Sequence, residues 1–314
     1  MKILLTGAFG FVGKSIQSKL RKHVVTLTSR SEEIENLSRF FRKTISSSEN
    51  FSDCLSNVDV VIHTAARVHQ MDDLAEDPLV EFMETNCFGT LNLARQAAQA
   101  GVKRFIFLSS IKVNGEESQS GRPFRFDDPR MPKDPYGISK AKAEEGLLKI
   151  AAETRLEVTI IRPPLVYGPD VKANFATLLK LASKNVPLPL GSVHNKRSFV
   201  ALDNLVNLIV TCIDHPKAAN QVFLISDDND VSTSKLFSIM VEVFDKKARL
   251  INVSPHFLRL IAKLIGKEEV IDRLCGDLSV DIRHTKNTLD WSPVVSLTDG
   301  VKKCVSHSLN TKRY

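Results

Sequence analysis

A short apolar run followed at once by three spaced glycines is the feature that constrains this chain most. Residues 3–6 read Ile-Leu-Leu-Thr, which is typical of a buried strand, and Gly7, Gly10 and Gly13 follow as GxxGxxG ahead of a periodic segment. In a strand–turn–helix unit the first glycine permits the tight turn, the second lets backbone approach a pyrophosphate, and the third allows close helix–strand packing. The helix N-terminus adds N–H donors. The pattern predicts dinucleotide binding at the first βα turn.

The rest of the N-terminal half repeats this alternation of apolar runs and helical segments. Further runs lie at 24–27, 58–63, 105–108 and 158–161. Continuous apolar strands separated by helices are typical of βαβ units and of a parallel sheet covered on both faces. We therefore predict an α/β fold with a doubly wound parallel sheet of the Rossmann type, which binds its ligands at the carboxyl ends of the strands.

The pattern loosens beyond Tyr167, where prolines cluster, and this change predicts a smaller, interleaved C-terminal substrate lobe. The run Val222–Ser226 is expected to return one strand to the main sheet. The predicted division is a Rossmann domain over 1–166 that also receives 198–226, and a substrate lobe built from 167–197 and 227–314. An apolar-rich helix at 256–265 is expected to pack on this lobe, with a helix on a membrane surface as the alternative.

Charge and cysteine content exclude several classes of function. The 314-residue chain has 43 Lys and Arg against 36 Asp and Glu, a formal charge of +7, but the cations are scattered, so we expect no nucleic-acid partner. Its five cysteines show no CxxC pair or metal-ligand spacing, which predicts free thiols and no metal. No signal peptide or spanning apolar run is evident, so we expect a cytoplasmic protein without membrane insertion.

The end of the second predicted strand bears on the choice of dinucleotide. An acidic residue there accepts hydrogen bonds from the adenosine ribose, whereas a basic residue suits a 2′-phosphate. The strand ends in Thr28, Ser29 and Arg30, without a carboxylate. This favours NADP and leaves NAD as the alternative.

Two later segments carry side chains suited to proton and hydride transfer. Ser109 and Ser110 end the run at 105–108, and Tyr136 and Lys140 stand four apart at the start of a helix, hence on one face. A free tyrosine titrates near 10. We expect the ammonium of Lys140, together with an oxidised nicotinamide, to lower the pKa of Tyr136 toward the working range. Ser110 is then predicted to hold a substrate hydroxyl while Tyr136 moves its proton.

With these motifs in place, the chain resembles the extended short-chain dehydrogenases/reductases of the NAD-dependent epimerase/dehydratase family, in particular their UDP-glucose 4-epimerase-like members. The likeness spans nearly the whole length. Besides GxxGxxG and YxxxK it includes VIHTAA (61–66), NCFGT (86–90), RPPLVYGP (162–169), KRSFVALDN (196–204) and LDWSP (289–293).

The resemblance completes the predicted site. Its catalytic residues are Ser110, Tyr136 and Lys140. The cofactor set is Gly7, Phe9, Gly10, Phe11, Val12, Gly13, Arg30, Ala65, Ala66, Asn86, Ser109, Tyr136, Lys140 and Pro163. The substrate set is Ser110, Asn174, Arg197 and Arg273, in which the arginines suit a diphosphate because a guanidinium donates in pairs. Two histidines are weighed beside them: His69 as a substrate contact or a solvated loop residue, and His63 as part of the core.

The resemblance also implies an NAD(P)-dependent enzyme that acts at C4 of a UDP-hexose or UDP-N-acetyl-(6-deoxy)hexose. It further implies a role in the synthesis of sugars for surface polysaccharides, and a homodimer. Because no carboxylate follows the second strand, a 4-keto reductase is favoured over the alternative, a UDP-glucose or UDP-GlcNAc 4-epimerase with retained cofactor. A non-catalytic dinucleotide sensor is the alternative of another class, and the intact Tyr–Lys pair argues against it. Dehydratases are disfavoured because Ile111 and Lys112 stand where they have an acidic pair. Leu165 replaces an Asn common in the family.

Overall fold

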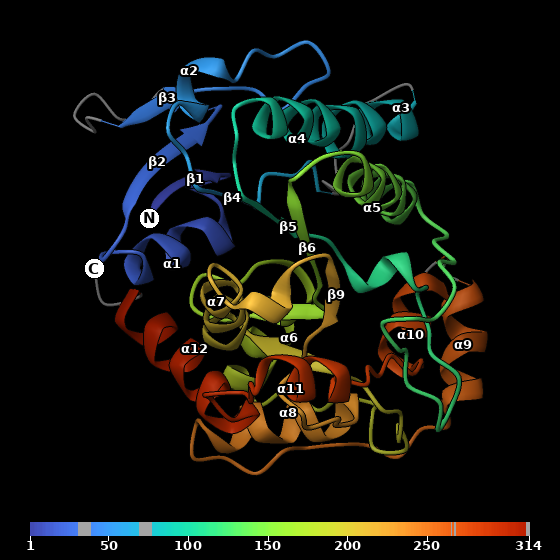
Figure 1. Ribbon diagram of the computed structural model, residues 1–314. Helices are drawn as coiled ribbons and strands as arrows, with labels where there is room; N and C mark the ends of the chain where they lie inside the picture. Colours follow the sequence, from blue (N-terminus) through green and yellow to red (C-terminus); the bar gives the residue numbers. More distant parts are fainter. Residues whose placement is uncertain (31–38, 69–76, 265, 267, 312–314) are drawn as a thin grey trace.

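The structure is a computed structural model that describes residues 1–30, 39–68, 77–264, 266 and 268–311 (Figure 1). Its described residues form a seven-stranded, entirely parallel sheet of strand order β3-β2-β1-β4-β5-β6-β9. The strands are β1 (Lys2–Thr6), β2 (Val24–Ser29), β3 (Phe40–Arg42), β4 (Val60–His63), β5 (Arg104–Leu108), β6 (Glu157–Arg162) and β9 (Gln221–Leu224). The predicted doubly wound parallel sheet is confirmed. β3, a strand of three residues, had no counterpart in the sequence pattern.

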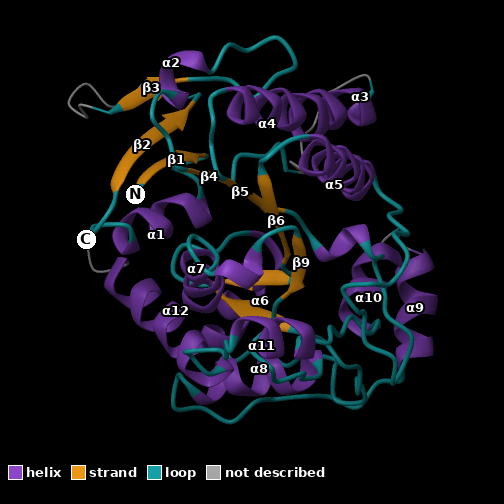
Figure 2. Ribbon diagram, viewed as in Figure 1, coloured by secondary structure: helices purple, strands orange, loops and turns teal. Residues whose placement is uncertain are grey.

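Helices cover both faces of this sheet (Figure 2). The first group is α1 (Phe11–Lys19), α2 (Ser52–Leu55), α3 (Pro78–Phe82), the π-helix η1 (Met83–Gly89), α4 (Thr90–Gln99), the 3₁₀ turn η2 (Ile111–Val113) and α5 (Pro135–Glu153). Successive side chains of β1 point to opposite faces. Ile3 joins the core cluster shared with α1 and α7 (Leu202–Thr211), whereas Leu4 joins the one shared with α4 and α5.

The C-terminal half is mostly helical and lies below the sheet in Figure 2. It contains a two-stranded parallel pair, β7 (Leu165–Tyr167) with β8 (Phe199–Ala201), that the sequence did not predict. Its remaining elements are α6 (Ala173–Lys184), η3 (Pro216–Ala218), α8 (Thr233–Glu242), α9 (Pro255–Leu264), α10 (Glu268–Cys275), α11 (Arg283–Leu289) and α12 (Leu297–Thr311). β9 pairs in parallel with β6, so the chain returns to the main sheet after α6 and α7.

The helix predicted at 256–265 is observed as α9. Leu258 and Ala262 are buried, and Leu258 packs with Leu190 and Val193 of the lobe. This packing was the expected one. The opposite stripe of α9 remains exposed and consists of Phe257, Leu260, Ile261 and Leu264. In the part of the chain that the structure describes, no helix is long and apolar enough to cross a bilayer.

Candidate active site

The glycine turn after β1 is as tight as the motif requires. Gly7 has φ +66°, and a Cβ placed on it would lie 2.7 Å from the backbone nitrogen of Ala65. A Cβ on Gly13 would lie 2.1 Å from the Gly7 carbonyl oxygen. Gly10 caps α1 and donates its N–H to that same oxygen at 2.9 Å. The turn therefore presents bare backbone at the N-terminus of α1, which fits a pyrophosphate.

Asn86 fixes the neighbouring loop. Its buried side chain accepts a hydrogen bond from the Arg67 N–H at 2.8 Å and donates to the Arg67 carbonyl at 3.0 Å and to Ser139 Oγ at 3.1 Å. These bonds join the loop after β4, which carries Ala65 and Ala66, to α5. Asn86 lies in η1, and π-helical turns are frequently found at functional sites.

The Tyr–Lys pair lies on the first turns of α5. Asp134 caps this helix by accepting the Gly137 N–H at 2.6 Å, and Pro135 occupies its first position. Lys140 is buried. Its Nζ donates to the Leu108 carbonyl at 2.9 Å and lies 6.0 Å from the centroid of the Tyr136 ring. Lys140 thus faces the end of β5.

Burial dominates the protonation of this pair. Desolvation, with the negative charge of Asp134 as a smaller contribution, raises the pKa of Tyr136 to about 12. Desolvation also lowers the pKa of Lys140 to about 7, against the opposing charge of Glu144. The expected lowering of the Tyr136 pKa is therefore not produced by the chain's own groups. The reason is that removing both side chains from water outweighs the attraction between them.

The two serines that end β5 have different surroundings. Ser110 is half-buried, and its Oγ accepts the N–H of Lys112 at 3.2 Å as the cap of η2. Ser109 is buried, and its Oγ donates to Glu144 Oε1 at 2.6 Å. The side chain of Ser109 is thus bound within the protein, and its contact with a cofactor stays a prediction.

A buried ion pair behind the Tyr–Lys pair was not predicted from the sequence. Arg162, the last residue of β6, donates to Glu144 of α5 through Nε at 2.9 Å and through Nη2 at 2.6 Å, and to Asn114 Oδ1 at 2.9 Å. Both charged side chains are almost fully buried. The one signal in the sequence was an arginine directly continuing an apolar strand, since a buried charge needs a partner.

A pocket of about 790 Å³ brings several predicted residues together. Tyr136, Arg197 and Arg273 all line it, with Lys112 and Arg259 as cations that sequence reasoning missed. Arg197 donates to the Gly276 carbonyl at 2.9 Å, and burial lowers the pKa of its guanidinium. The pocket therefore holds both the phenol and guanidinium groups.

Asn174 does not line that pocket. It is the exposed second residue of α6. A second pocket, of about 930 Å³, runs between α1, α6, α7 and α12, and it shares Phe9, Gly10 and Phe11 with the predicted cofactor set. Because most of that set lies elsewhere, we do not equate this pocket with the cofactor site.

The other predicted cofactor residues are dispersed around the turn. Val12 is half-buried on α1, Arg30 is exposed just after β2, and the buried Pro163 accepts the Ile111 N–H at 2.9 Å. Their contacts with a cofactor stay predictions. Leu165, the departure from the family pattern, is partly exposed on β7.

The two histidines have separate outcomes. His63 is fully buried, bonded to Thr6 Oγ1 at 2.6 Å and to Thr90 Oγ1 at 2.9 Å, and burial lowers its pKa to about 3. Its prediction as a core residue is confirmed. His69 lies outside the described residues. All five cysteines are free thiols, and no group of residues able to hold a metal ion occurs within the described ranges.

Comparison with known proteins places this geometry in a family. The family model described as the NAD dependent epimerase/dehydratase family matches residues 3–226. A UDP-glucose 4-epimerase of Vibrio cholerae is 49% identical over 306 residues, covering 96% of this chain and 93% of that protein. The chain belongs to the NAD-dependent epimerase/dehydratase family, which confirms the predicted resemblance and the prediction of an enzyme with a nicotinamide dinucleotide as cofactor.

Two solved structures agree over the full length. A Thermotoga maritima UDP-glucose 4-epimerase, solved with UDP-glucose, superposes with a TM-score of 0.78 at 25% identity, covering 99% of this chain and 100% of that one. A Bacillus cereus UDP-glucuronic acid 4-epimerase, solved with NAD, gives a TM-score of 0.79 at 23% identity, with 99% of both chains covered. The second likeness bears on the fold alone.

Proposed function

We propose that this protein is a 4-epimerase of a UDP-hexose or UDP-N-acetylhexose that transfers hydride at sugar C4. The observation that carries the proposal is one pocket lined by Tyr136, Arg197 and Arg273. A phenol and two guanidinium groups in one pocket suit a sugar joined to a diphosphate. The Vibrio cholerae relative supports 4-epimerisation, and a role in surface-polysaccharide synthesis belongs to the same proposal.

Each residue has a definite part in this reaction. Ser110 holds the 4-hydroxyl, and Tyr136 takes its proton as the C4–H hydride leaves. A nicotinamide bound at the glycine turn would accept the C4 hydride and later return it. Lys140, anchored at the Leu108 carbonyl, would hold the nicotinamide ribose. After rotation of the 4-keto sugar, Tyr136 would give the proton back to O4 as hydride adds to the opposite face of C4. Arg197 and Arg273 keep the diphosphate bound throughout.

A 4-keto reductase is the second candidate, and the chemistry after β2 favours it. An exposed Arg30 follows that strand, where a carboxylate would select NAD. A reductase exchanges its cofactor at each turnover, and NADPH suits that use. We therefore propose that NADP is accepted here, with NAD as the alternative.

One set of incubations separates the candidates. The protein is incubated with UDP-glucose, UDP-GlcNAc or a UDP-4-keto-6-deoxy sugar, with and without NADPH, and products are followed by NMR and nicotinamide absorbance. Inversion at C4 without net cofactor consumption is expected of the epimerase. Stoichiometric oxidation of NADPH on the keto sugar would assign the reductase instead. If the protein binds a dinucleotide but turns over none of these sugars, a non-catalytic dinucleotide sensor is the candidate that remains.

Tyr136→Phe tests the proton transfer directly. Because the phenol is the group that moves the proton, we expect kcat to fall by about 10²–10⁴-fold, while dinucleotide affinity, measured by calorimetry, stays near that of the wild type. Tyr167→Phe is the matched control: its hydroxyl bonds Asp227 at 2.7 Å inside the lobe, so stability should change more than kcat. Undiminished turnover in Tyr136→Phe would remove this residue from the mechanism.

A further inference from the structure

Lys112 is bonded to both elements that carry the catalytic side chains. Its backbone N–H donates to Ser110 Oγ at 3.2 Å, which ties it to the end of β5. Its Nζ forms an ion pair and hydrogen bond with Asp134, the cap of α5, two residues before Tyr136. Lys112 also lines the substrate pocket beside Tyr136. One residue therefore connects the serine end of the site, through its backbone N–H, to the tyrosine end, through its ammonium.

We propose that Lys112 is a positioning residue for proton transfer: it neutralises Asp134 beside the phenol of Tyr136 and locks the Ser110 turn to the start of α5. The proposal deepens the function above and rests on Tyr136 being the proton-transfer group. In dehydratases of the resembled family an acidic residue occupies the position of Lys112. The charge at this position is therefore positive here, where those enzymes have a negative one.

Asp134 has two opposed effects on the site. Its Oδ1 caps α5 through the Gly137 N–H, which fixes the turn that carries Tyr136. Its negative charge also raises the pKa of Tyr136, because a carboxylate disfavours a nearby phenolate. Asp134 raises this pKa even with the ammonium of Lys112 paired to it. We infer that losing the ammonium would raise it further, while the cap on α5 would remain.

Other charged groups line the same pocket from several elements. They are Glu116 and Glu117 after η2, Lys133 before α5, Arg197 before β8, Arg259 on α9, and Asp272 and Arg273 on α10. Arg259 pairs with Asp272 at 2.9 Å, and Glu116 lies 3.8 Å from Lys112 Nζ. Lys140 does not line the pocket; its Nζ lies 6.0 Å from the centroid of the Tyr136 ring and donates to the Leu108 carbonyl. Among these groups and Asp134, the Asp134 carboxylate is the one whose charge raises the pKa of Tyr136.

Stability alone does not account for the pair. Lys112 is 36% exposed and Asp134 28% exposed, and pairs of that exposure contribute little to folding. Lys112→Met is therefore expected to remain folded, with a thermal midpoint close to that of the wild type, so that its effect on the reaction can be measured separately.

The test is a set of pH profiles of kcat/KM for the holoenzyme. Proton removal by Tyr136 makes kcat/KM rise with pH. Lys112→Met leaves the charge of Asp134 uncompensated. The midpoint of the rise in kcat/KM should therefore shift to higher pH by about 0.5–1 pH unit. Asp134→Asn keeps an N-cap but removes the carboxylate, so the midpoint of the rise in kcat/KM should shift to lower pH. The pH profile of the double variant, with Lys112→Met and Asp134→Asn together, should lie close to that of the wild type. The profile of Lys112→Arg should also match that of the wild type.

Lys142→Met is the matched control. Lys142 also pairs with an acidic residue of α5, Glu145 at 3.0 Å, but both side chains are mostly exposed and neither lines the pocket. Its pH profile should coincide with that of the wild type. A purely structural Lys112–Asp134 pair would lower the rate in both single variants without shifting the profile in opposite directions. An unshifted profile in Lys112→Met, or shifts of the same sign, overturns the proposal.

A second readout does not depend on turnover. The ultraviolet phenolate absorbance of the NAD-bound protein is titrated in the wild type and in Lys112→Met, each after subtraction of the matching Tyr136→Phe protein. Lys112→Met should titrate at higher pH. If the wild type converts none of the UDP-sugars, the proposed function fails, whereas this titration still decides whether Lys112 sets the ionisation of Tyr136. Identical titrations would overturn the inference about Lys112 alone.

Discussion

Lys140 shows what the burial of a residue proposed for catalysis costs in stability. Its ammonium is almost fully buried, with one carbonyl partner and the face of Phe107 4.4 Å away. A backbone carbonyl and a cation–π contact replace only part of the hydration that a cation has in water. The buried lysine is therefore expected to oppose folding at neutral pH, in the way that active-site groups often do.

Lys140→Met tests that cost. The pKa of Lys140, about 7 in the folded chain, lies below the 10.5 of free lysine, so the unfolded chain binds more protons between these pH values. Stability of the wild type should rise with pH across that window. Methionine does not titrate, so the variant should be more stable by about 1–3 kcal/mol at pH 7, with a gap that closes toward pH 10.5 in urea unfolding. A less stable variant throughout would show that the contacts of Lys140 outweigh its desolvation.

The sequence identified the residues whose type and spacing encode chemistry. Tyr136 and Lys140 were found because a four-residue spacing puts them on one helical face, and the structure places them together on α5. Glu144 and Lys112 were not found, because each acts through partners distant in the chain, Arg162 and Asp134. Only folding brings these partners together, so no local pattern signals them.

At the scale of elements, the orientation of α5 depends on the buried ion pair between Glu144 and Arg162. Glu144 also accepts from Ser109 at 2.6 Å and from Arg130 at 3.3 Å. The carboxylate thus joins α5 to the ends of β5 and β6, one helical turn after Lys140. Removing Glu144 would leave Arg162 buried without a carboxylate, and removing Arg162 would leave Glu144 with only the partly exposed Arg130 as a cationic partner.

Single substitutions of this pair should be costly. We expect Glu144→Leu to lower the free energy of unfolding by about 3–5 kcal/mol, because Arg162 is left buried without a carboxylate. Arg162→Met should cost the same or less, because Glu144 keeps Arg130. The double variant should cost less than the sum of the two. Glu145→Gln, in an exposed pair on the same helix, should cost under about 1 kcal/mol. Urea unfolding measures all four, and additive losses would contradict a coupled pair.

The main elements follow from the sequence where apolar periodicity is strong. The runs behind β1, β4, β5, β6 and β9 each contain several buried apolar residues, and the apolar run behind β2 contains the buried Leu27, which made all of them recognisable. β3, β7 and β8 have three residues each, too few to show a period. The π-helix η1 was also not foreseen, since one extra residue per turn depends on the tertiary bonds of Asn86 rather than on helix propensity.

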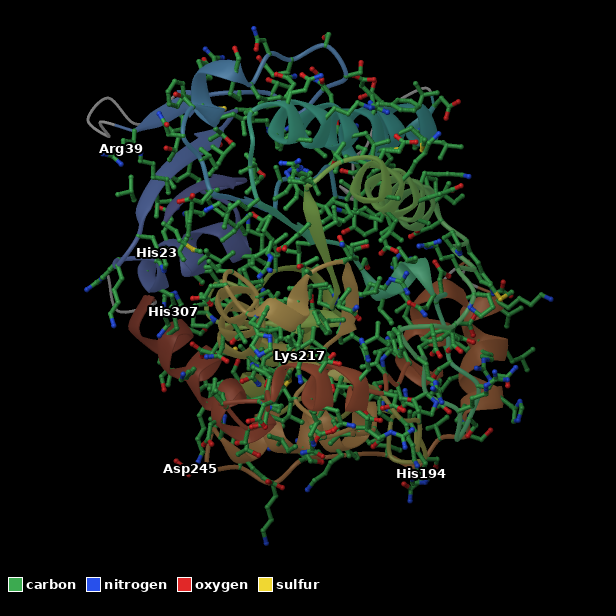
Figure 3. All side chains as sticks on the ribbon, in the orientation of Figure 1. His23, Arg39, His194, Lys217, Asp245 and His307 are labelled. Atoms are coloured by element: carbon green, nitrogen blue, oxygen red, sulfur yellow. The ribbon has the colours of Figure 1, made fainter. Side chains whose placement is uncertain are left out.

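At the scale of the whole molecule, residues from the two halves of the chain pack in one core and contribute strands to one sheet. α7 follows the β7–β8 pair, yet packs on α1: Leu205 and Ile209 share a core cluster with Ile16. β9 then closes the sheet beside β6. On the opposite side, His307 of α12 bonds Asp170 at 2.8 Å, and Figure 3 shows it near α1 at the edge of the molecule. Segments from the C-terminal half of the chain therefore complete the hydrophobic core around β1 and α1.

This interleaving makes the proposed Rossmann domain of 1–166 dependent on 198–226. A fragment of residues 1–196 lacks α7 and β9, so it leaves the apolar face of α1 uncovered and the edge of β6 unpaired. We expect it to show no cooperative unfolding transition. A fragment of residues 1–230 regains both elements and should unfold cooperatively, below the midpoint of the full chain because Trp291 and Leu289 are missing from that core. Circular dichroism during urea titration distinguishes them. A cooperative transition in 1–196, with dinucleotide affinity retained, would mean that the first domain is complete before the chain returns to it.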